Sequence, residues 1–290
     1  SGFQRIAEFV GDLDKGYSSP KQQVFAVQKD FESLEVHVES FQYEELPKEG
    51  EEKSDHTFSL QDIYFAGKRG ELLGLVGLSG SGKSTLLSIM SGNIIPDHAD
   101  IVLHCRDCED IHYPGSSLED IIAYREQVGI VSQESHIFTE SLAFNICMTH
   151  RRPDDFDEFW HNLLEQLPYL KEWGIQPEQE INPKEMSLGQ KQLIAALRAC
   201  YLKKTVVLFD EISSGLDSQL EQALRKMVLL VQSNSLTVIV AHRLETIMQA
   251  DKIFVMEDGR LVSSGNHKLL MSESPVYRRF VHELSHSPAT

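Results

Sequence analysis

The sequence has few cysteines, no long apolar run and a deficit of positive charge. Its 290 residues include 4 cysteines, which do not make a disulfide scaffold at this length. No apolar run reaches the roughly 20 residues of a membrane helix, and no basic-then-apolar secretory start is present. The formal net charge of −17 repels nucleic acid and anionic lipid at long range. These absences favour an ordinary globular protein, as do the 41% hydrophobic and 24% charged residues.

Two of the cysteines lie close together in the sequence. Cys105 and Cys108 form a C-x-x-C pair that is flanked by His104 and His112. A zinc site is conceivable, but no second ligand pair has the standard spacing. We therefore favour a reduced surface loop.

The most informative stretch is a glycine-rich turn at residues 77–85. It follows the apolar run Leu72–Val76 and completes the phosphate-binding pattern of Gly, four residues, Gly-Lys-Ser, between a strand and a helix. Glycine lets the backbone approach a polyphosphate, and the helix start adds its positive end. The lysine can reach the β- and γ-phosphates, and the serine hydroxyl can hold Mg²⁺. A glycine turn before an ordinary core helix is the alternative. The expected phosphate contacts are Gly77, Ser79, Gly80, Ser81, Gly82, Lys83, Ser84 and Thr85.

A second apolar run, Thr205–Phe209, ends in two carboxylates. Such groups at the carboxyl edge of a parallel sheet face the ligand crevice. Asp210 is suited to bind Mg²⁺, and Glu211 can orient and polarise an attacking water. Strands often end in solvated acids, but the phosphate-binding turn upstream favours catalysis.

Two further segments complete the candidate site. Ser187-Leu188-Gly189-Gln190 opens a helix, where Ser187 can serve as N-cap and as part of an anion site at once. His242 follows the apolar run Leu236–Val240, which places it at the same sheet edge as Asp210. A lone histidine there is more often structural.

The rest of the chain is predicted to consist of strands and helices with connecting loops. The alternation of apolar and charged residues from Leu34 to Tyr43 predicts an edge strand. The many charged residues at 44–56 predict a solvated loop rather than a docking tail. An apolar stripe predicts a helix over Asp154–Leu167, behind Asp154 or Asp155 as cap. We also expect an amphipathic helix at 3–13, a linker at 14–31, helices near 83–90 and 190–202, and short strands with polar turns at 99–131.

Together these segments resemble the nucleotide-binding domain of ABC transporters, from about residue 34 to residue 284. In that family's terms, residues 77–85 are Walker A, 187–190 the signature, 206–210 Walker B and 214–217 the D-loop. The resemblance implies catalytic roles for Glu211, His242, Gln133 and Lys83. It implies metal contacts at Ser84, Gln133 and Asp210. It also implies nucleotide contacts at Ser187, Gly189, Gln190, Asp217 and Tyr43, whose ring would stack on adenine unless it is a plain strand aromatic.

The exporter branch is the most similar, through residues 137–146 and 250–262. It implies an α/β P-loop NTPase core with a mostly parallel sheet, a small antiparallel β-part and an inserted helical subdomain near 135–200. Residues 1–33 would lead from a membrane domain into an ATPase domain at 34–290. The implied function is ATP binding and hydrolysis for export, with ATP and Mg²⁺, at the cytoplasmic face of an inner or plasma membrane. The implied partners are a second nucleotide-binding domain, alike or different, and a transmembrane domain, but no nucleic acid.

Two departures from the family pattern affect this interpretation. Leu188 stands where the signature usually has glycine, and its side chain would crowd a γ-phosphate. Residues 181–185 lack the usual exporter Glu-x-Gly. A regulatory, low-turnover half of a heterodimer is therefore one alternative, although Lys83, Glu211 and His242 argue against it. A soluble ABC ATPase of DNA repair or translation is the other, disfavoured by the acidic charge and the missing coiled-coil insertion. The sequence does not indicate the cargo.

Overall fold

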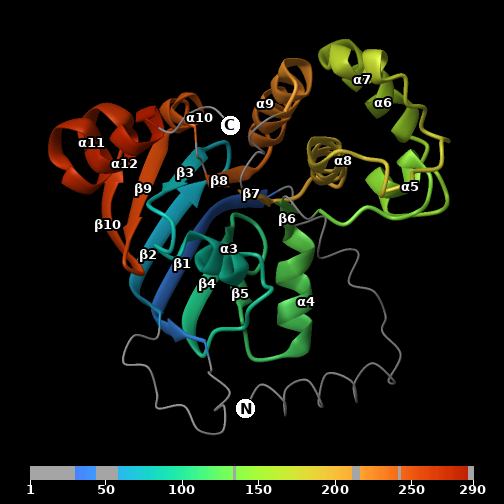
Figure 1. The fold of residues 1–290 in the computed structure, drawn as a ribbon. Helices are drawn as coiled ribbons and strands as arrows, with labels where there is room; N and C mark the ends of the chain where they lie inside the picture. Colours follow the sequence, from blue (N-terminus) through green and yellow to red (C-terminus); the bar gives the residue numbers. More distant parts are fainter. Residues whose placement is uncertain (1–29, 44–57, 133–134, 211–215, 241–242, 287–290) are drawn as a thin grey trace, which may run out of the picture.

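The computed structural model describes residues 30–43, 58–132, 135–210, 216–240 and 243–286 (Figure 1). Two sheets form its centre, and helices pack around them (Figure 1). The predicted α/β class, with a mostly parallel sheet and a smaller antiparallel one, is confirmed. The sequence predictions for residues 1–29 and 44–56 concern segments outside the described residues.

The larger sheet has the strand order β10-β9-β3-β8-β7-β6. Strands β3, β8, β7 and β6 run parallel, β9 runs parallel to β3, and only β10 is antiparallel to its neighbour. Every residue of β3 and of β8 is buried, which explains why both read as unbroken apolar runs. The bounds are β3 (Leu72–Val76), β6 (Val128–Val131), β7 (Val206–Asp210), β8 (Leu236–Val240), β9 (Lys252–Glu257) and β10 (Arg260–Gly265).

The smaller sheet is antiparallel, in the order β2-β1-β4-β5. Its strands are β1 (Phe31–Gln42), β2 (Ser59–Lys68), β4 (His98–Cys105) and β5 (Ile111–Tyr113). The prediction of an edge strand at 34–43 was wrong, because β1 pairs with β2 on one side and with β4 on the other. The alternation of Leu34, Val36 and Val38 with polar residues shows that one face of the strand is buried. One buried face is common to inner strands and edge strands, so the alternation does not distinguish them.

The helices agree with the sequence in most places. The predictions near 83–90, 154–167 and 190–202 are confirmed, with small shifts at the ends. Asp155 is the N-cap of α6, but its carboxylate accepts a hydrogen bond from Tyr201 instead of capping the helix. The helices are α3 (Lys83–Met90), α4 (Leu118–Gln127), α5 (Leu142–Cys147), α6 (Phe156–Gln166), α7 (Pro168–Trp173), α8 (Leu188–Tyr201), α9 (Ser218–Gln232), α10 (Leu244–Met248), α11 (His267–Glu273) and α12 (Pro275–His286).

The larger sheet separates two apolar cores. Leu73 and Leu75 of β3 belong to the core that contains α3 and the antiparallel sheet. Leu72 and Val76 of the same strand belong to the core on the other face, with α5 to α9 and α12. Burial of a leucine or valine stabilises a fold by about 1.5–3 kcal/mol, so each short strand supports both layers. Both faces of the larger sheet are thus packed against an apolar core.

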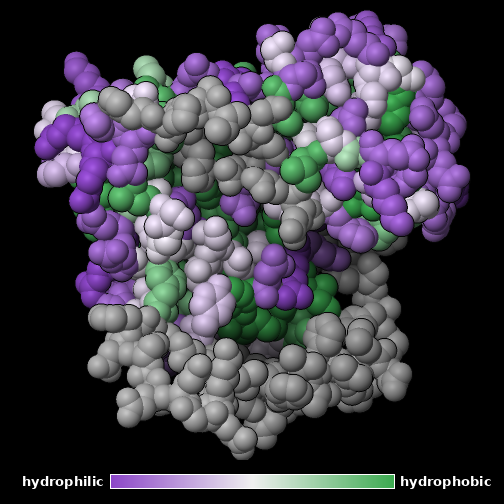
Figure 2. All heavy atoms as spheres, in the orientation of Figure 1, coloured by the Kyte–Doolittle hydropathy of each residue, from purple (hydrophilic) through white to green (hydrophobic). Residues whose placement is uncertain are grey.

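Helices α5, α6 and α7 and most of α8 lie within residues 135–200, where the sequence predicts an inserted helical subdomain. Phe156, Trp160 and Leu163 of α6 are buried in the core shared with the larger sheet. The face seen in Figure 2 is largely hydrophilic over α6 and α7, as the amphipathic stripe requires. Among the described residues, no helix combines the length and the apolar character needed to cross a bilayer.

Candidate functional site

The turn between β3 and α3 has a backbone that requires glycine. Gly82, the N-cap of α3, has φ +104°, and a Cβ there would lie 2.7 Å from side-chain carbons of Leu60 and Phe58. A Cβ on Gly77 would lie 2.3 Å from the Met256 carbonyl oxygen. No side chain fits at either position without displacing a neighbour. The tight backbone of this turn therefore depends on its glycines.

Lys83 lies inside this turn. Its Nζ donates to the carbonyl oxygens of Gly77 and Leu78, both at 2.9 Å, and its side chain is buried. Helix α3 has no side-chain cap at its N-terminus, and the N–H groups in the first turn of a helix point toward the place where an anion can bind. The ammonium group and these N–H groups together fit a polyphosphate.

Strand β8 brings Asp210 level with the phosphate-binding turn. Val240 pairs with Leu75 of β3 on one side and with Asp210 of β7 on the other, so the three residues form one row at the carboxyl edge of the sheet. Gly77 follows two residues after Leu75. Ser84 and Asp210 supply the hydroxyl and carboxylate oxygens that Mg²⁺ prefers.

Several predicted site residues lie outside the described part of the chain. They are Gln133, Glu211 and His242, together with Ser214 and Gly215 of the D-loop. Glu211 directly follows β7, and His242 follows β8 by two residues. Their roles stay predictions.

Tyr43 comes directly after β1 and lies beside α3. Its hydroxyl donates to Thr85 Oγ1 at 3.4 Å, while 48% of the residue remains exposed. The predicted stacking ring is therefore next to the phosphate-binding turn.

A hairpin turn that the sequence reasoning missed also supports the phosphate-binding turn. Gly259 donates its N–H to the Ser81 carbonyl oxygen at 3.1 Å and accepts from the Gln61 N–H at 3.0 Å. Positive φ values at Asp258 (47°) and Gly259 (74°) indicate a type I′ turn between β9 and β10. An Asp-Gly pair between two strands is the usual signal for this turn.

The signature residues begin a helix away from the phosphate-binding turn. Ser187 Oγ accepts from the Gln190 N–H at 3.2 Å, and Gln190 Oε1 accepts from the Ser187 N–H at 3.0 Å, so the predicted N-cap is confirmed as a capping box. Helix α8 packs mainly on α9, α5 and β6. Gly189 is buried, and a Cβ there would lie 2.5 Å from a Leu216 methyl carbon. Asp217, the predicted D-loop contact, is the N-cap of α9.

Leu188 differs from its signature neighbours, because it is 50% exposed. It is the first residue of α8, directly after the Ser187 cap. Its apolar side chain therefore lies on the surface beside the predicted nucleotide contacts.

An ion-pair cluster holds the segment that follows β8. Glu221 of α9 accepts hydrogen bonds from Arg243 and from Arg225, the latter at 2.7 Å. Burial opposes the charged form of Glu221, but these two guanidinium groups outweigh it and lower the pKa of the carboxyl below its usual value. Arg225 also pairs with Glu245 of α10. The cluster ties α9 to the residue after His242.

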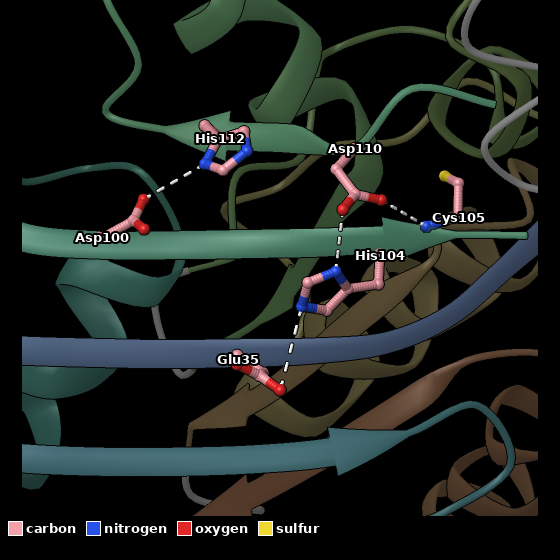
Figure 3. A network of polar contacts seen from close by, with 6 residues as sticks. All are labelled: Glu35, Asp100, His104, Cys105, Asp110 and His112. Carbon is pink, nitrogen blue, oxygen red and sulfur yellow. Dashed lines mark hydrogen bonds and ion pairs between the residues drawn. The ribbon is translucent and has the colours of Figure 1, made fainter.

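The C-x-x-C segment forms a different kind of network (Figure 3). His104 lies between two carboxylates, with Nδ1 2.9 Å from Asp110 and Nε2 3.9 Å from Glu35 (Figure 3). Asp110 also accepts the Cys105 N–H at 2.9 Å. Neither Cys105 nor Cys108 is in a disulfide. The described residues contain no cluster of three or more ligands that could hold a metal, so nothing here supports the zinc alternative.

The comparisons with known proteins agree with this geometry. The family model described as "ABC transporter" matches residues 60–214. The chain belongs to the ABC transporter family. The match begins in β2 and includes the phosphate-binding turn, the signature and Asp210. The part of an ABC transporter present here is its ATPase domain.

Several relatives are transporters. The chain is 33% identical to "ABC-type transporter fsqE" of Aspergillus fumigatus, over 91% of this chain and 19% of that protein. It is 33% identical to the "ATP-dependent lipid A-core flippase" of Sodalis glossinidius, over 79% of this chain and 38% of the flippase. A bacterial Atm1-family ABC exporter solved with ATP bound has a TM-score of 0.68 and 25% identity, over 88% of this chain and 42% of the exporter. The chain thus spans less than half the length of each.

Proposed function

We propose that this chain binds and hydrolyses Mg-ATP to drive a membrane exporter. The observation that carries the proposal is the single sheet edge that places the phosphate-binding turn and Asp210 on either side of β8. The three relatives named above are transporters, which supports export over a soluble ATPase. The chain would then act at the cytoplasmic face of the membrane that contains the exporter.

Each residue has a role that follows from its chemistry. Lys83 exchanges its carbonyl partners for the β- and γ-phosphates. Ser84 and Asp210, with Gln133, would hold Mg²⁺, which when bound neutralises phosphate charge. Glu211 orients the attacking water, and His242 contacts the γ-phosphate from the next strand. Tyr43 stacks on the base.

The ATP site would be completed by a second nucleotide-binding domain, facing the first head to tail. Support comes from the position of the signature, since α8 packs mainly on α9, α5 and β6, and Ser187 is exposed. Ser187, Gly189 and Gln190 of one domain would then contact the ATP held by the other. ATP bound between the domains stabilises their association, and hydrolysis releases it.

A surface on the helical part would dock the transmembrane domain. His136, Phe138, Phe144 and His150 form a row of ring contacts with centroids 4.6, 5.8 and 4.6 Å apart. Met148, beside this row, is 41% exposed. Aromatic and methionine side chains are enriched at protein interfaces. In the full-length transporter, Met148→Asp should weaken the stimulation of ATP hydrolysis by cargo.

The proposal is tested by measuring phosphate release from ATP by the purified chain. We expect turnover that requires Mg²⁺ and rises more than linearly with protein concentration, because two domains share each site. Turnover that is absent with and without candidate partner domains would reject the proposal.

A regulatory half of a heterodimer is the second candidate. The exposed Leu188 favours it, since a leucine beside the γ-phosphate hinders the close approach of the signature. This candidate predicts ATP binding without turnover by the chain alone, and turnover only with a different partner domain.

A further inference from the structure

We propose that Phe41 is a positioning residue for the nucleotide base, because together with Thr85 it fixes the orientation of the Tyr43 ring. The inference rests on the proposed ATP binding and names a residue outside the phosphate-binding motif. Phe41 touches Tyr43, and it acts on the nucleotide only through that ring.

The contact between the two rings follows from strand geometry. Residues two apart in extended backbone lie on the same side of it; Phe41 lies in β1, which ends at Gln42, and Tyr43 follows the strand directly. Their ring centroids are 5.0 Å apart at an interplanar angle of 82°. This edge-to-face arrangement is favourable for aromatic pairs. The Phe41 ring therefore favours one orientation of the Tyr43 ring.

Phe41 is itself held in place. It is half-buried and packs against the core between the two sheets, and it pairs with Leu60 of β2. Leu60 in turn lies against Gly82, at the start of α3. The strand end that carries the two rings is thus packed against the phosphate-binding turn.

The hydroxyl of Tyr43 provides the second point of attachment. It donates to Thr85 Oγ1 at 3.4 Å, and Thr85 is nearly buried in α3, two residues after Lys83. A tyrosine ring has two side-chain torsions, so an edge contact and a hydroxyl contact restrict both. Nearly half of Tyr43 stays exposed, which leaves ring surface for a planar base. Preorganisation of this kind reduces the ordering cost that binding must otherwise overcome.

The test compares ligands with and without a base. Calorimetry would measure the affinities of ATP, ADP and inorganic tripolyphosphate for the wild type and for Phe41→Leu. We expect Phe41→Leu to weaken ATP and ADP binding about threefold to tenfold and to leave tripolyphosphate binding unchanged. Phe41→Tyr, which keeps the ring, should restore the affinities. Phe159→Leu, in α6, is the matched control.

A fluorescence measurement reports on stacking itself. The triphosphate of 2-aminopurine riboside loses fluorescence when its base stacks on an aromatic ring. At saturating protein, Phe41→Leu should quench the 2-aminopurine fluorescence less than the wild type does. Tyr43→Phe, which removes only the hydroxyl contact, should also quench less, and it tests the inference even if Phe41→Leu fails to fold.

The outcomes separate this inference from the proposed function. Equal ATP affinity and equal quenching in Phe41→Leu and the wild type would overturn the positioning role while leaving ATP binding intact. An equal loss for ATP and for tripolyphosphate would also overturn it, since Phe41 would then support the phosphate-binding turn. A wild type that binds neither ligand would overturn the proposed function, and this inference with it.

Discussion

At the scale of single residues, Lys83 explains how the phosphate-binding turn keeps its shape. Its ammonium group is hydrogen-bonded to the carbonyl oxygens of Gly77 and Leu78, both of which belong to the turn. A phosphate must replace these neutral acceptors by charged oxygens, and charge-assisted hydrogen bonds are the stronger ones. The lysine thus holds the turn closed before binding and attracts the ligand during it.

Replacement of Lys83 by alanine should therefore weaken ATP binding strongly. A lost charge-assisted contact costs about 1.5–3 kcal/mol, or roughly tenfold to 150-fold in affinity. Calorimetry with ATP measures this effect, and Lys171→Ala on the exposed side of α7 is the control. An affinity equal to that of the wild type would contradict the assignment of the turn.

At the scale of elements, the β9–β10 hairpin connects the antiparallel sheet to the phosphate-binding turn through Gly259. A Cβ at this position would lie 1.9 Å from the Ser59 carbonyl oxygen, and φ is +74°. Gly259→Ala should therefore destabilise the fold by more than the ~1–2 kcal/mol of a left-handed alanine, and it should weaken ATP binding because Ser81 loses its partner. Thermal melts measure the first effect.

Gly174 offers a matched control for the hairpin. Its φ of +69° is similar, but nothing lies within 4 Å of an added Cβ. Gly174→Ala should therefore show the conformational cost alone. Equal losses of stability in the two variants would mean that the contact with Ser59 is unimportant.

The ion pairs of Glu221 should make stability depend on pH. The folded pKa of this carboxyl is below its ordinary value of 4.5, so its contribution to stability is complete above that value. The contribution is lost as the pH falls through the folded pKa. The stability gap between the wild type and Glu221→Gln should therefore narrow in acid, as measured by denaturant unfolding over a pH series. Glu158→Gln, at an exposed position of α6, should show no such change.

The sequence predicted best those elements whose pattern is local. Buried parallel strands and α6 follow from apolar runs and from a stripe with helical spacing. Helix α4 was missed because its face is only partly buried; its signal was the capping box of Ser117 with Asp120. The position of β1 inside its sheet could not be predicted from the sequence. Alternation indicates that one face of the strand is buried, but it does not indicate whether one strand or two strands pair with it.

At the scale of the whole molecule, the candidate site is divided between two regions of the chain. The phosphate-binding turn, Asp210 and Tyr43 lie around α3 and one sheet edge. Ser187 lies at the start of α8, which packs mainly on other elements. A division of this kind predicts that ATP controls association of two domains.

Replacement of Glu211 by glutamine should separate hydrolysis from binding. The amide keeps the shape of the carboxylate but cannot polarise water, so turnover should fall by ~100-fold or more, the scale of a positioned base. ATP binding should persist, because Lys83 and the helix start hold the phosphates. The trapped ATP should then yield a stable dimer in sedimentation. Unchanged turnover would contradict the assigned role of Glu211.

Leu188 decides whether that dimer forms between identical chains. Gly189 is buried beside Leu216, whereas the side chain of Leu188 is exposed next to it. If the leucine blocks the γ-phosphate, Glu211→Gln will stay monomeric at saturating ATP, and Leu188→Gly in the same background should restore the dimer. The rescue would be specific to the obstruction, because a glycine leaves the Ser187 capping box intact while it removes the obstructing side chain. Sedimentation with ATP, and with ADP as control, distinguishes the cases. A full dimer in Glu211→Gln alone would show that Leu188 is tolerated and would favour a homodimeric engine over a regulatory half.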